Sequence, residues 1–372
     1  MMLGVEKRLL RPAFLLGVLA VFLSLPIVHA QSVKELPPPP PNWKPKPTPT
    51  PTPPEKEVID VIRTTSNLVM VPVSVTDRNG QAVQGLTKTD FRLEEEGKQQ
   101  EISEMGDPEQ VPLEIALLID VSGSTHTRFD FEKTAAARFL REVLKKDDRA
   151  SLFMIDRVPV LKQVSSTADV AANALLAFVP AADKGPTAFY DTVVEAAQYL
   201  EKTPARHRRV VVVISDGADN FSEIIKKTIG TTAEEQLSAS AEVKDRVNAR
   251  ALSAVERSLQ RADAVFYAIN PAGNTMYLNV ITRRGHEGMQ RLADSTGGNT
   301  FVPEVDADLA GVFSRIAAEL RGQYLLQYYA SSEAPATQFR RIRVTVPART
   351  DLKIRARQGF YPKKQQDSSR TP

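Results

Sequence analysis

The middle of the chain contains four continuous apolar runs that are rich in β-branched residues. These runs are Ile115–Ile119, Ser151–Ile155, Val210–Ile214 and Ala264–Ile269. Segments with helical periodicity separate and follow them, among them Phe129–Leu144, Ala188–Leu200 and Leu309–Leu320. Strands that are apolar on both faces have to be covered on both faces, and their alternation with helices is typical of a parallel sheet. The pattern therefore predicts an α/β domain over residues 112–321, with a mostly parallel sheet and helices on both of its faces.

The segments on either side of this region alternate apolar and polar residues instead. Before it, Val69–Val75 has a valine at every second position and leads into a turn at Asp77–Gly80. Three short strand patterns follow, at Ala82–Gln84, Phe91–Glu95 and Gln100–Glu104, and three more stand near the C-terminus, at Tyr324–Tyr329, Arg341–Val346 and Leu352–Arg357. About fifty residues make a marginal independent core. We therefore expect the N-terminal β segment, residues 58–111, and the C-terminal β segment, residues 322–362, to form one small β-sandwich into which the α/β domain is inserted.

The first thirty residues have the order of a secretory signal peptide. Three basic residues between positions 7 and 11 precede the apolar run Ala13–Leu25, and small residues stand before Gln31. That run is shorter than the ~20 residues that a membrane-spanning helix needs. Residues 1–30 therefore predict export, with cleavage after Ala30 and no integral membrane segment in the mature chain. We expect a secreted, periplasmic or cell-envelope protein.

Two further segments have the composition of unfolded chain. Eleven of the eighteen residues from Pro37 to Pro54 are proline, a density that favours extended polyproline II over helix or sheet. Residues 31–57 are therefore interpreted as a stiff linker, and residues 363–372 as a disordered tail.

The composition excludes several classes of protein. The chain has 48 Lys and Arg against 45 Asp and Glu, a balance too even for an electrostatic nucleic-acid binder. It has no cysteine, which excludes disulfides, thiolate metal sites, iron–sulfur clusters and a cysteine nucleophile. With 42% hydrophobic residues among its 372, it has enough apolar side chains to bury a core.

Acidic residues follow or end three of the predicted buried strands. They are Asp120, Asp156 and Asp216. In sheets of this kind ligands bind beyond the carboxyl ends of the strands. For Asp156 alone, we expect only a helix cap or a solvated loop residue.

Hydroxyl residues accompany the other two acids. Ser122 and Ser124 follow Asp120 at alternate positions, and Thr187 precedes a predicted helix. Together with Asp216 they form a set of five oxygen-bearing side chains without His or Cys. Hard oxygen ligands favour Mg²⁺, Ca²⁺ or Mn²⁺ over zinc. Any one of the hydroxyls alone is explained as a helix cap, but all five in this order predict a metal site.

The same pattern resembles the metal-ion-dependent adhesion site of von Willebrand factor A domains. The family's Asp-x-Ser-x-Ser, Thr and Asp-Gly positions match Asp120, Ser122, Ser124, Thr187 and Asp216 without a substitution. The resemblance covers about residues 112–321 and implies a Rossmann-like fold. The flanks, including Leu86–Phe91 and Gly359–Tyr361, resemble secreted bacterial proteins in which such a domain lies between β segments. One departure is a long charged helical stretch, Glu223–Ala262, which we interpret as a lid over the site or an extra partner surface.

This resemblance also implies how the site works. Ser122 and Ser124 would bind Mg²⁺, or else Mn²⁺ or Ca²⁺, directly. Thr187 would bind directly or through water, and Asp120 and Asp216 mostly through water. Neutral hydroxyls leave the charge of the cation largely uncompensated, so its open position attracts an anionic ligand. We expect that ligand to be an exposed Asp or Glu of a partner protein, which makes the chain a metal-dependent binding or adhesion module.

Enzymatic alternatives lack required residues. A haloacid-dehalogenase phosphatase also has an Asp after its first strand and a later acidic pair resembling Asp216 and Asp219. It needs a second acid where this chain has Ser122. The chain lacks the Gly-x-Ser-x-Gly turn that a Ser-His-Asp hydrolase needs, and His126 is interpreted as an exposed loop residue. The chain also lacks the Gly-x-Gly-x-x-Gly motif of a dinucleotide-binding site. We therefore expect no enzymatic activity and no organic cofactor.

A structural role is the remaining alternative. From position 338 onward ten basic residues face two acids, a local charge of about +8. Arg341 and Arg343 alternate with apolar residues and so share one face of a strand. This basic C-terminal segment is interpreted as a solvated edge that blocks aggregation, or as a surface that docks an anionic envelope polymer.

Overall fold

The central sheet of the protein is formed by the continuous apolar runs. The computed structural model describes residues 68–121, 126–179, 185–204, 206–273, 280–304, 308–330, 335 and 337–362. All of them belong to one compact unit, Arg63–Pro372. The predicted signal peptide, proline-rich linker and C-terminal tail lie outside the described residues. Among the described helices none is long and apolar enough to cross a membrane.

The central sheet has six strands in the order β10-β9-β8-β5-β6-β7. Their bounds are β5 Leu113–Asp120, β6 Arg149–Ile155, β7 Val160–Ser166, β8 Arg208–Ile214, β9 Ala264–Ile269 and β10 Asn299–Phe301. All neighbours pair in parallel except β6 and β7. The mostly parallel sheet is thus confirmed, and the four predicted runs are its four central strands. The two edge strands were not predicted, because β10 is short and the side chains of β7 are almost all exposed or half-buried, so β7 has no continuous apolar run.

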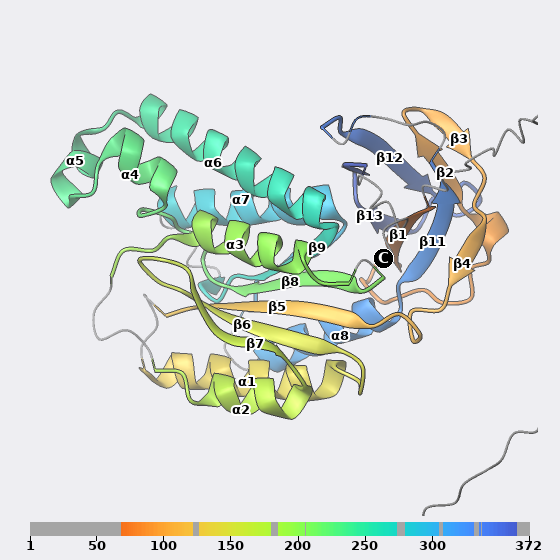
Figure 1. Ribbon diagram of the computed structural model, residues 1–372, viewed down its shortest axis with the longest axis horizontal. Helices are drawn as coiled ribbons and strands as arrows, with labels where there is room; N and C mark the ends of the chain where they lie inside the picture. The colour runs from red at the N-terminus through yellow and green to blue at the C-terminus, as the bar shows by residue number, and fades with distance from the viewer. Residues whose placement is uncertain are drawn as a thin grey trace, which may run out of the picture. The chain divides into compact units, whose positions relative to one another are not determined.

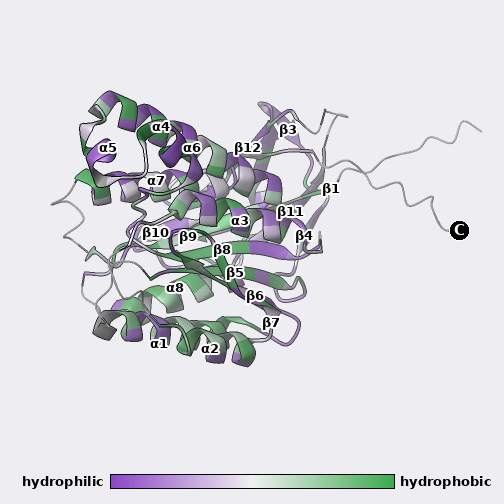
Figure 2. Ribbon diagram, turned by 60° about the vertical axis from the view of Figure 1, so that its left-hand side comes forward, coloured by the Kyte–Doolittle hydropathy of each residue, from purple (hydrophilic) through white to green (hydrophobic). Residues whose placement is uncertain are grey.

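Helices cover both faces of this sheet (Figure 1). One layer contains α1 His126–Val143, α2 Ala168–Leu176 and α8 Leu309–Arg321, and the other α3 Phe189–Glu201, α6 Ala241–Ala262 and α7 Val280–Thr296. Alternate residues of β5 divide between the two cores: Leu117 packs with the first layer and Leu118 with the second. The hydropathy colouring of Figure 2 accordingly shows central strands that are mostly hydrophobic. Burial of both faces explains why β5 reads as a continuous apolar run.

The charged stretch Glu223–Ala262 forms three helices, α4 Glu223–Ile229, α5 Ala233–Ser238 and α6. Gly230 ends α4 with a φ of 114°, in the region that favours glycine. Thr232 and Glu235 then form a capping box at the start of α5. The three helices, here called the insertion, follow β8 directly, and α4 packs beside α6 (Figure 1).

The two ends of the chain meet in two antiparallel four-stranded sheets, ordered β13-β1-β11-β4 and β14-β12-β2-β3. The bounds are β1 Leu68–Thr76, β2 Arg92–Glu95, β3 Lys98–Gln100, β4 Glu104–Gly106, β11 Tyr324–Tyr329, β12 Arg340–Thr345, β13 Lys353–Ala356 and β14 Gly359–Phe360, with a 3₁₀ turn at Lys88–Asp90. Valines of β1 pack with Leu93 of β2, Leu326 of β11 and Ile342 of β12 in one core. The predicted sandwich of N- and C-terminal strands is therefore confirmed.

Two of the short predicted strands differ from the structure. Gln100–Glu104 was expected as one strand, but β3 ends at Gln100 and β4 begins at Glu104, each in a different sheet. Ala82–Gln84 was also expected as a strand, and among these residues only Ala82 makes a bridge, to Thr76. The first difference arises because β3 and β4 pair with different strands, β2 and β11, which the local sequence does not indicate.

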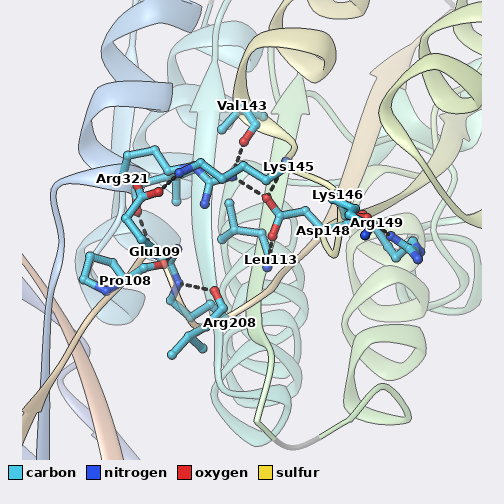
Figure 3. Close-up of polar contacts among 12 residues, drawn as sticks. Pro108, Glu109, Leu113, Val143, Lys145, Lys146, Asp148, Arg149, Arg208 and Arg321 are labelled. Atoms are coloured by element: carbon cyan, nitrogen blue, oxygen red, sulfur yellow. Dashed lines mark hydrogen bonds and ion pairs between the residues drawn. The ribbon is translucent and has the colours of Figure 1, made fainter.

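A buried arginine network holds the chain where it enters and leaves the α/β domain (Figure 3). Arg208, at the start of β8, donates to the carbonyl oxygens of Leu320 at 2.6 Å and Pro108 at 2.8 Å. Burial lowers the pKa of Arg208 to about 10, and the charge of Arg321 acts in the same direction. Arg321 in turn pairs with Asp148. The end of α8 is therefore tied to the edge of the sheet at which β5 and β8 begin.

Candidate metal site

The first part of the candidate site lies where β5 and β8 end side by side. Asp120 is the last residue of β5, and Ser215-Asp216 follows β8 directly. The Oγ of Ser215 donates a hydrogen bond of 2.8 Å to Oδ2 of Asp120 and accepts one of 3.0 Å from the amide of Gly217. Ser215 thus joins the ends of the two strands and holds the Asp120 carboxylate at the carboxyl edge of the sheet. The sequence reading did not single out Ser215, although its position between a buried strand and Asp216 was visible.

The segment with Thr187 is joined to the same loop by its backbone. The amide of Thr187 donates to Oδ1 of Asn220 at 2.7 Å, and the carbonyl oxygen of Thr187 accepts from the amides of Asn220 and Phe221, each at 3.1 Å. The amide of the next residue, Ala188, donates to the carbonyl oxygen of Asp156 at 2.9 Å. Thr187 is buried. Its position is therefore fixed from two sides, by the loop after β8 and by the loop after β6.

A close backbone contact sets the position of Asp216. Its Oδ1 accepts a hydrogen bond of 2.9 Å from the amide of Ala218, and Gly217 adopts a φ of 75°. Opposite this turn lies Gly285 of α7, where a Cβ atom would be 2.5 Å from the carbonyl oxygen of Asp216 and 2.6 Å from the carbonyl carbon of Gly217. Glycines at both positions thus allow α7 to pack directly on the Asp216 turn.

Asp219, three residues after Asp216, accepts hydrogen bonds from backbone amides of this region. Its carboxylate accepts hydrogen bonds from the amides of Tyr190 (2.7 Å), Phe221 (3.1 Å) and Ser222 (2.9 Å), and from the hydroxyl of Ser222. Burial raises the pKa of Asp219, while these hydrogen bonds act to lower it. Because the carboxylate is used to fix the start of α3 and the loop, it does not resemble the free second acid of a phosphatase.

The chemistry of the donors fits a hard divalent cation. Of the five predicted ligands, Asp120, Thr187 and Asp216 lie in the described part of the chain, while Ser122 and Ser124 lie outside it. The three described side chains offer two carboxylates and a hydroxyl, all of them oxygen donors, which suits Mg²⁺, Mn²⁺ or Ca²⁺. Among the described residues no group of three or more His, Cys, Asp or Glu is arranged to hold a metal.

Other polar residues considered from the sequence lie elsewhere or are engaged. Asp156 accepts from the amide of Arg157 at 2.7 Å, as expected of a loop residue. His126 begins α1, and its side chain lies outside the described residues. His207 precedes β8, at the opposite end of that strand from Asp216, and its Nδ1 lies 3.5 Å from Oε2 of Glu114. His207 is therefore too far along β8 to form a triad with the hydroxyls of the candidate site.

Much of the C-terminal basic charge is neutralised inside the protein. Arg340 pairs with Glu95, Arg355 with Glu319 at 2.6 Å, and Arg357 with Asp263 at 2.5 Å. The Arg355 and Arg357 pairs join the C-terminal strands to the α/β domain. Arg341 and Arg343 are exposed on one face of β12, as predicted. Among the described residues the exposed basic surface is accordingly smaller than the sequence indicates.

Comparison with known proteins places part of the chain in a family. Residues 115–218 match the von Willebrand factor type A domain. Among solved structures, the PilB minor pilin from Streptococcus sanguinis is 14% identical, with a TM-score of 0.44 over 57% of this chain and 62% of that chain. A von Willebrand factor type A structure from Catenulispora acidiphila is 13% identical, with a TM-score of 0.41 over 70% and 51% of the two chains. Proximal thread matrix protein 1 from the mussel byssus, with a zinc-occupied MIDAS motif, is 14% identical, with a TM-score of 0.41 over 60% and 48%.

The region similar to the pilin thus spans less than two thirds of that protein. A search of curated proteins gave no match. At these identities and TM-scores, only the family match is close enough to bear on function.

Proposed function

Since the chain contains a von Willebrand factor type A domain, matched over residues 115–218, we propose that it binds a partner through a divalent cation at the carboxyl edge of its central sheet. The protein acts as a binding or adhesion module, and the partner supplies an acidic side chain. The N-terminal sequence supports a secreted or cell-envelope location, because residues 1–30 have the order of a signal peptide.

One observation carries this proposal. Three segments that are far apart in the sequence are joined by hydrogen bonds at one edge of the sheet. The first ends at Asp120, the second contains Thr187, and the third is the loop with Ser215 and Asp216. Each of them presents an oxygen-bearing side chain of the adhesion-site pattern. The bonds are made mainly by Ser215 and Asn220, which belong to the same loop as Asp216. These bonds support the proposal, because they hold the three segments together at the edge where the cation would bind.

The cation would be held by oxygen atoms of Asp120, Ser122, Ser124, Thr187 and Asp216. When bound, it supplies positive charge and an open coordination position that attract a carboxylate. The two aspartates accept hydrogen bonds from Ser215 and the amide of Ala218, so they are positioned before any ion binds. We assign no catalytic role to them, because Asp219 is committed to four hydrogen bonds and Ser122 stands where a phosphatase needs an acid.

Thermal unfolding of the full chain with added Mg²⁺, Mn²⁺, Ca²⁺ or Zn²⁺ tests this function. A ligand that binds only the folded protein stabilises it by about 2.7 kcal/mol at a hundredfold excess over its Kd. With an unfolding entropy of about 2.1 cal/mol/K per residue, that stabilisation raises the Tm of a folded region of about 300 residues by about 4 °C. We expect Mg²⁺ or Mn²⁺ to give this rise and Asp120→Ala to abolish it.

Asp156→Ala is the matched control. It removes an acid from the end of the neighbouring strand β6, whose carboxylate serves only its own loop, and it should keep the full rise. If Asp120→Ala responds to the ions as strongly as the unchanged protein, the ions bind elsewhere and the proposed function is wrong.

A further inference from the structure

A cavity of about 550 Å³ lies beside the candidate metal site, between the insertion and α7. Thr187 and the turn residues Gly217 and Ala218 line one side of it, and these residues border the candidate metal site as well. Its volume falls in the range of pockets that hold small ligands or a few side chains. This cavity is here called the insertion cavity.

The walls of the insertion cavity are largely apolar and partly open to solvent. Ile225 and Ile229 of α4, Leu237 of α5, and Val280 and Ile281 of α7 line it. Leu237 is 81% exposed, and Val280 and Ile281 are each 57% exposed. Large apolar side chains that gather around one concave surface mark a binding site more often than isolated exposed ones do.

Hydrogen bonds between the helices hold the walls in place. The Nε2 of Gln236 on α5 donates to the carbonyl oxygen of Asn220 at 2.7 Å, which ties the insertion to the loop of the metal site. Arg284 of α7 pairs with Asp245 of α6. Tyr190 donates to Oδ1 of Asn248 at 3.3 Å. Because these contacts come from five different segments (α3, α5, α6, α7 and the loop after β8), they hold the walls of the cavity in a defined arrangement.

The charges around the cavity favour an anionic partner. Asp219 is the only acid among the described residues that line it, and its carboxylate is occupied by backbone and Ser222 donors. Lys244 contributes positive charge, whereas the guanidinium of Arg284 is already paired with Asp245. Within the described part of the chain, no ion pair engages the ammonium group of Lys244. A segment with a carboxylate near an apolar group therefore matches both the lining and its charge.

We propose that the insertion cavity receives an apolar side chain of the partner whose carboxylate binds at the metal site. The recognised segment of the partner is an acidic residue with a side chain the size of leucine or phenylalanine within a few positions of it. This inference rests on the proposed function, since it uses the same edge of the sheet. It gives the insertion a role as a specificity-determining surface rather than as a closed lid.

Synthetic peptides test the proposal directly. The probe is a fluorescein-labelled, glycine-rich peptide with one aspartate and one phenylalanine separated by one to three glycines. Two control peptides have the same sequence except that asparagine replaces the aspartate in one and glycine replaces the phenylalanine in the other. Binding to the full chain is measured by fluorescence anisotropy, in Mg²⁺ and in chelator. Burying one such apolar side chain changes an equilibrium constant by about 10- to 100-fold, so the phenylalanine-to-glycine peptide should bind that much more weakly.

Variants of the cavity give the matched comparison. Ala241→Trp places a ring in the cavity and should reduce the affinity of the phenylalanine peptide to that of its glycine counterpart. Lys244→Gln should weaken the aspartate peptides about 2- to 5-fold. Ala249→Trp, on an exposed face of α6 outside the cavity, and Lys227→Gln, on α4, are the controls and should leave both peptides unchanged.

The outcomes distinguish a failure of the cavity proposal from a failure of the proposed metal-dependent function. Equal binding of the phenylalanine and glycine peptides, still dependent on Mg²⁺ and lost in Asp120→Ala, would overturn the cavity proposal and leave the proposed function standing. A phenylalanine effect that is lost in Ala241→Trp but persists in chelator would instead refute the metal-dependent function and the joint site with it. Failure of every peptide to bind at millimolar concentration would show that an acidic–apolar segment is not the occupant.

Discussion

Replacing Gly285 by alanine tests the contact that positions Asp216. Two opposing effects act on this substitution. Alanine in a helix interior is more favourable than glycine by about 1 kcal/mol. Against this, the new Cβ would lie 2.5 Å from the carbonyl oxygen of Asp216, and 2.6 and 2.8 Å from carbonyl atoms of Gly217. All three are backbone atoms, so relief requires α7 or the turn to move.

Gly288 on the same helix separates the two effects. A Cβ atom there would meet only Leu252, at 3.6 Å, which is an ordinary contact. Gly288→Ala should therefore gain about 0.5–1 kcal/mol of stability. Overpacking typically costs about 1–3 kcal/mol, so Gly285→Ala should be less stable than Gly288→Ala by about 2 kcal/mol. For a folded region of about 300 residues, that difference separates their Tm values by about 3 °C.

Circular dichroism melts of both variants measure the difference, and a Mg²⁺ titration adds a second readout. Because the displaced turn carries Asp216, Gly285→Ala should also need a higher Mg²⁺ concentration for half of its stabilisation, whereas Gly288→Ala should not. Equal Tm values for the two variants would refute the close contact between α7 and the turn. A lower Tm with unchanged Mg²⁺ dependence would refute the link from that contact to the metal site.

Two further predictions concern stability. Arg355→Met leaves Glu319 buried without its partner and should lower the free energy of unfolding by about 3–5 kcal/mol. Adding Glu319→Leu to this variant should restore most of the lost stability. Urea denaturation measures both changes, and additive losses would show that the pair is not coupled. Burial lowers the pKa of His286 from its ordinary value of 6.5, against the opposite effect of Glu287. The folded state therefore disfavours the protonated imidazole, and stability should fall as the pH drops through 6.5 and below. His286→Gln should reduce this loss in denaturation curves at pH 7.5 and 5.5, and an unchanged loss would assign the effect to other groups.

The sequence predicted the elements whose environment is the same along their whole length. β5 is buried on both faces, so its apolar residues are continuous and its end at Asp120 is visible. The valines of β1 alternate because only one face of that strand meets the sandwich core. In both cases the burial pattern appears directly in the order of residues.

The remaining features depend on partners that are distant in the sequence. Asp219 was considered only as part of the acidic pair of the rejected phosphatase alternative, and its hydrogen bond from the amide of Tyr190 becomes visible only in the fold. The insertion was expected as one helical stretch, although Gly230 and the capping box at Thr232 mark its breaks locally. The insertion cavity has no local signal, because its walls come from the insertion, α7 and the loop after β8.

Insertion of the α/β domain into the sandwich has a consequence for the order of folding. The Oγ of Ser103 donates to the carbonyl oxygen of Gln327, 224 residues away. Closing a flexible loop of that length costs about 5 kcal/mol of chain entropy, which falls once the α/β domain has folded and brought its own ends together. At about 5–20 residues per second of synthesis, β1 waits at least roughly 10 s for β11. During that time its valine-rich edge is unpaired and open to association with other chains.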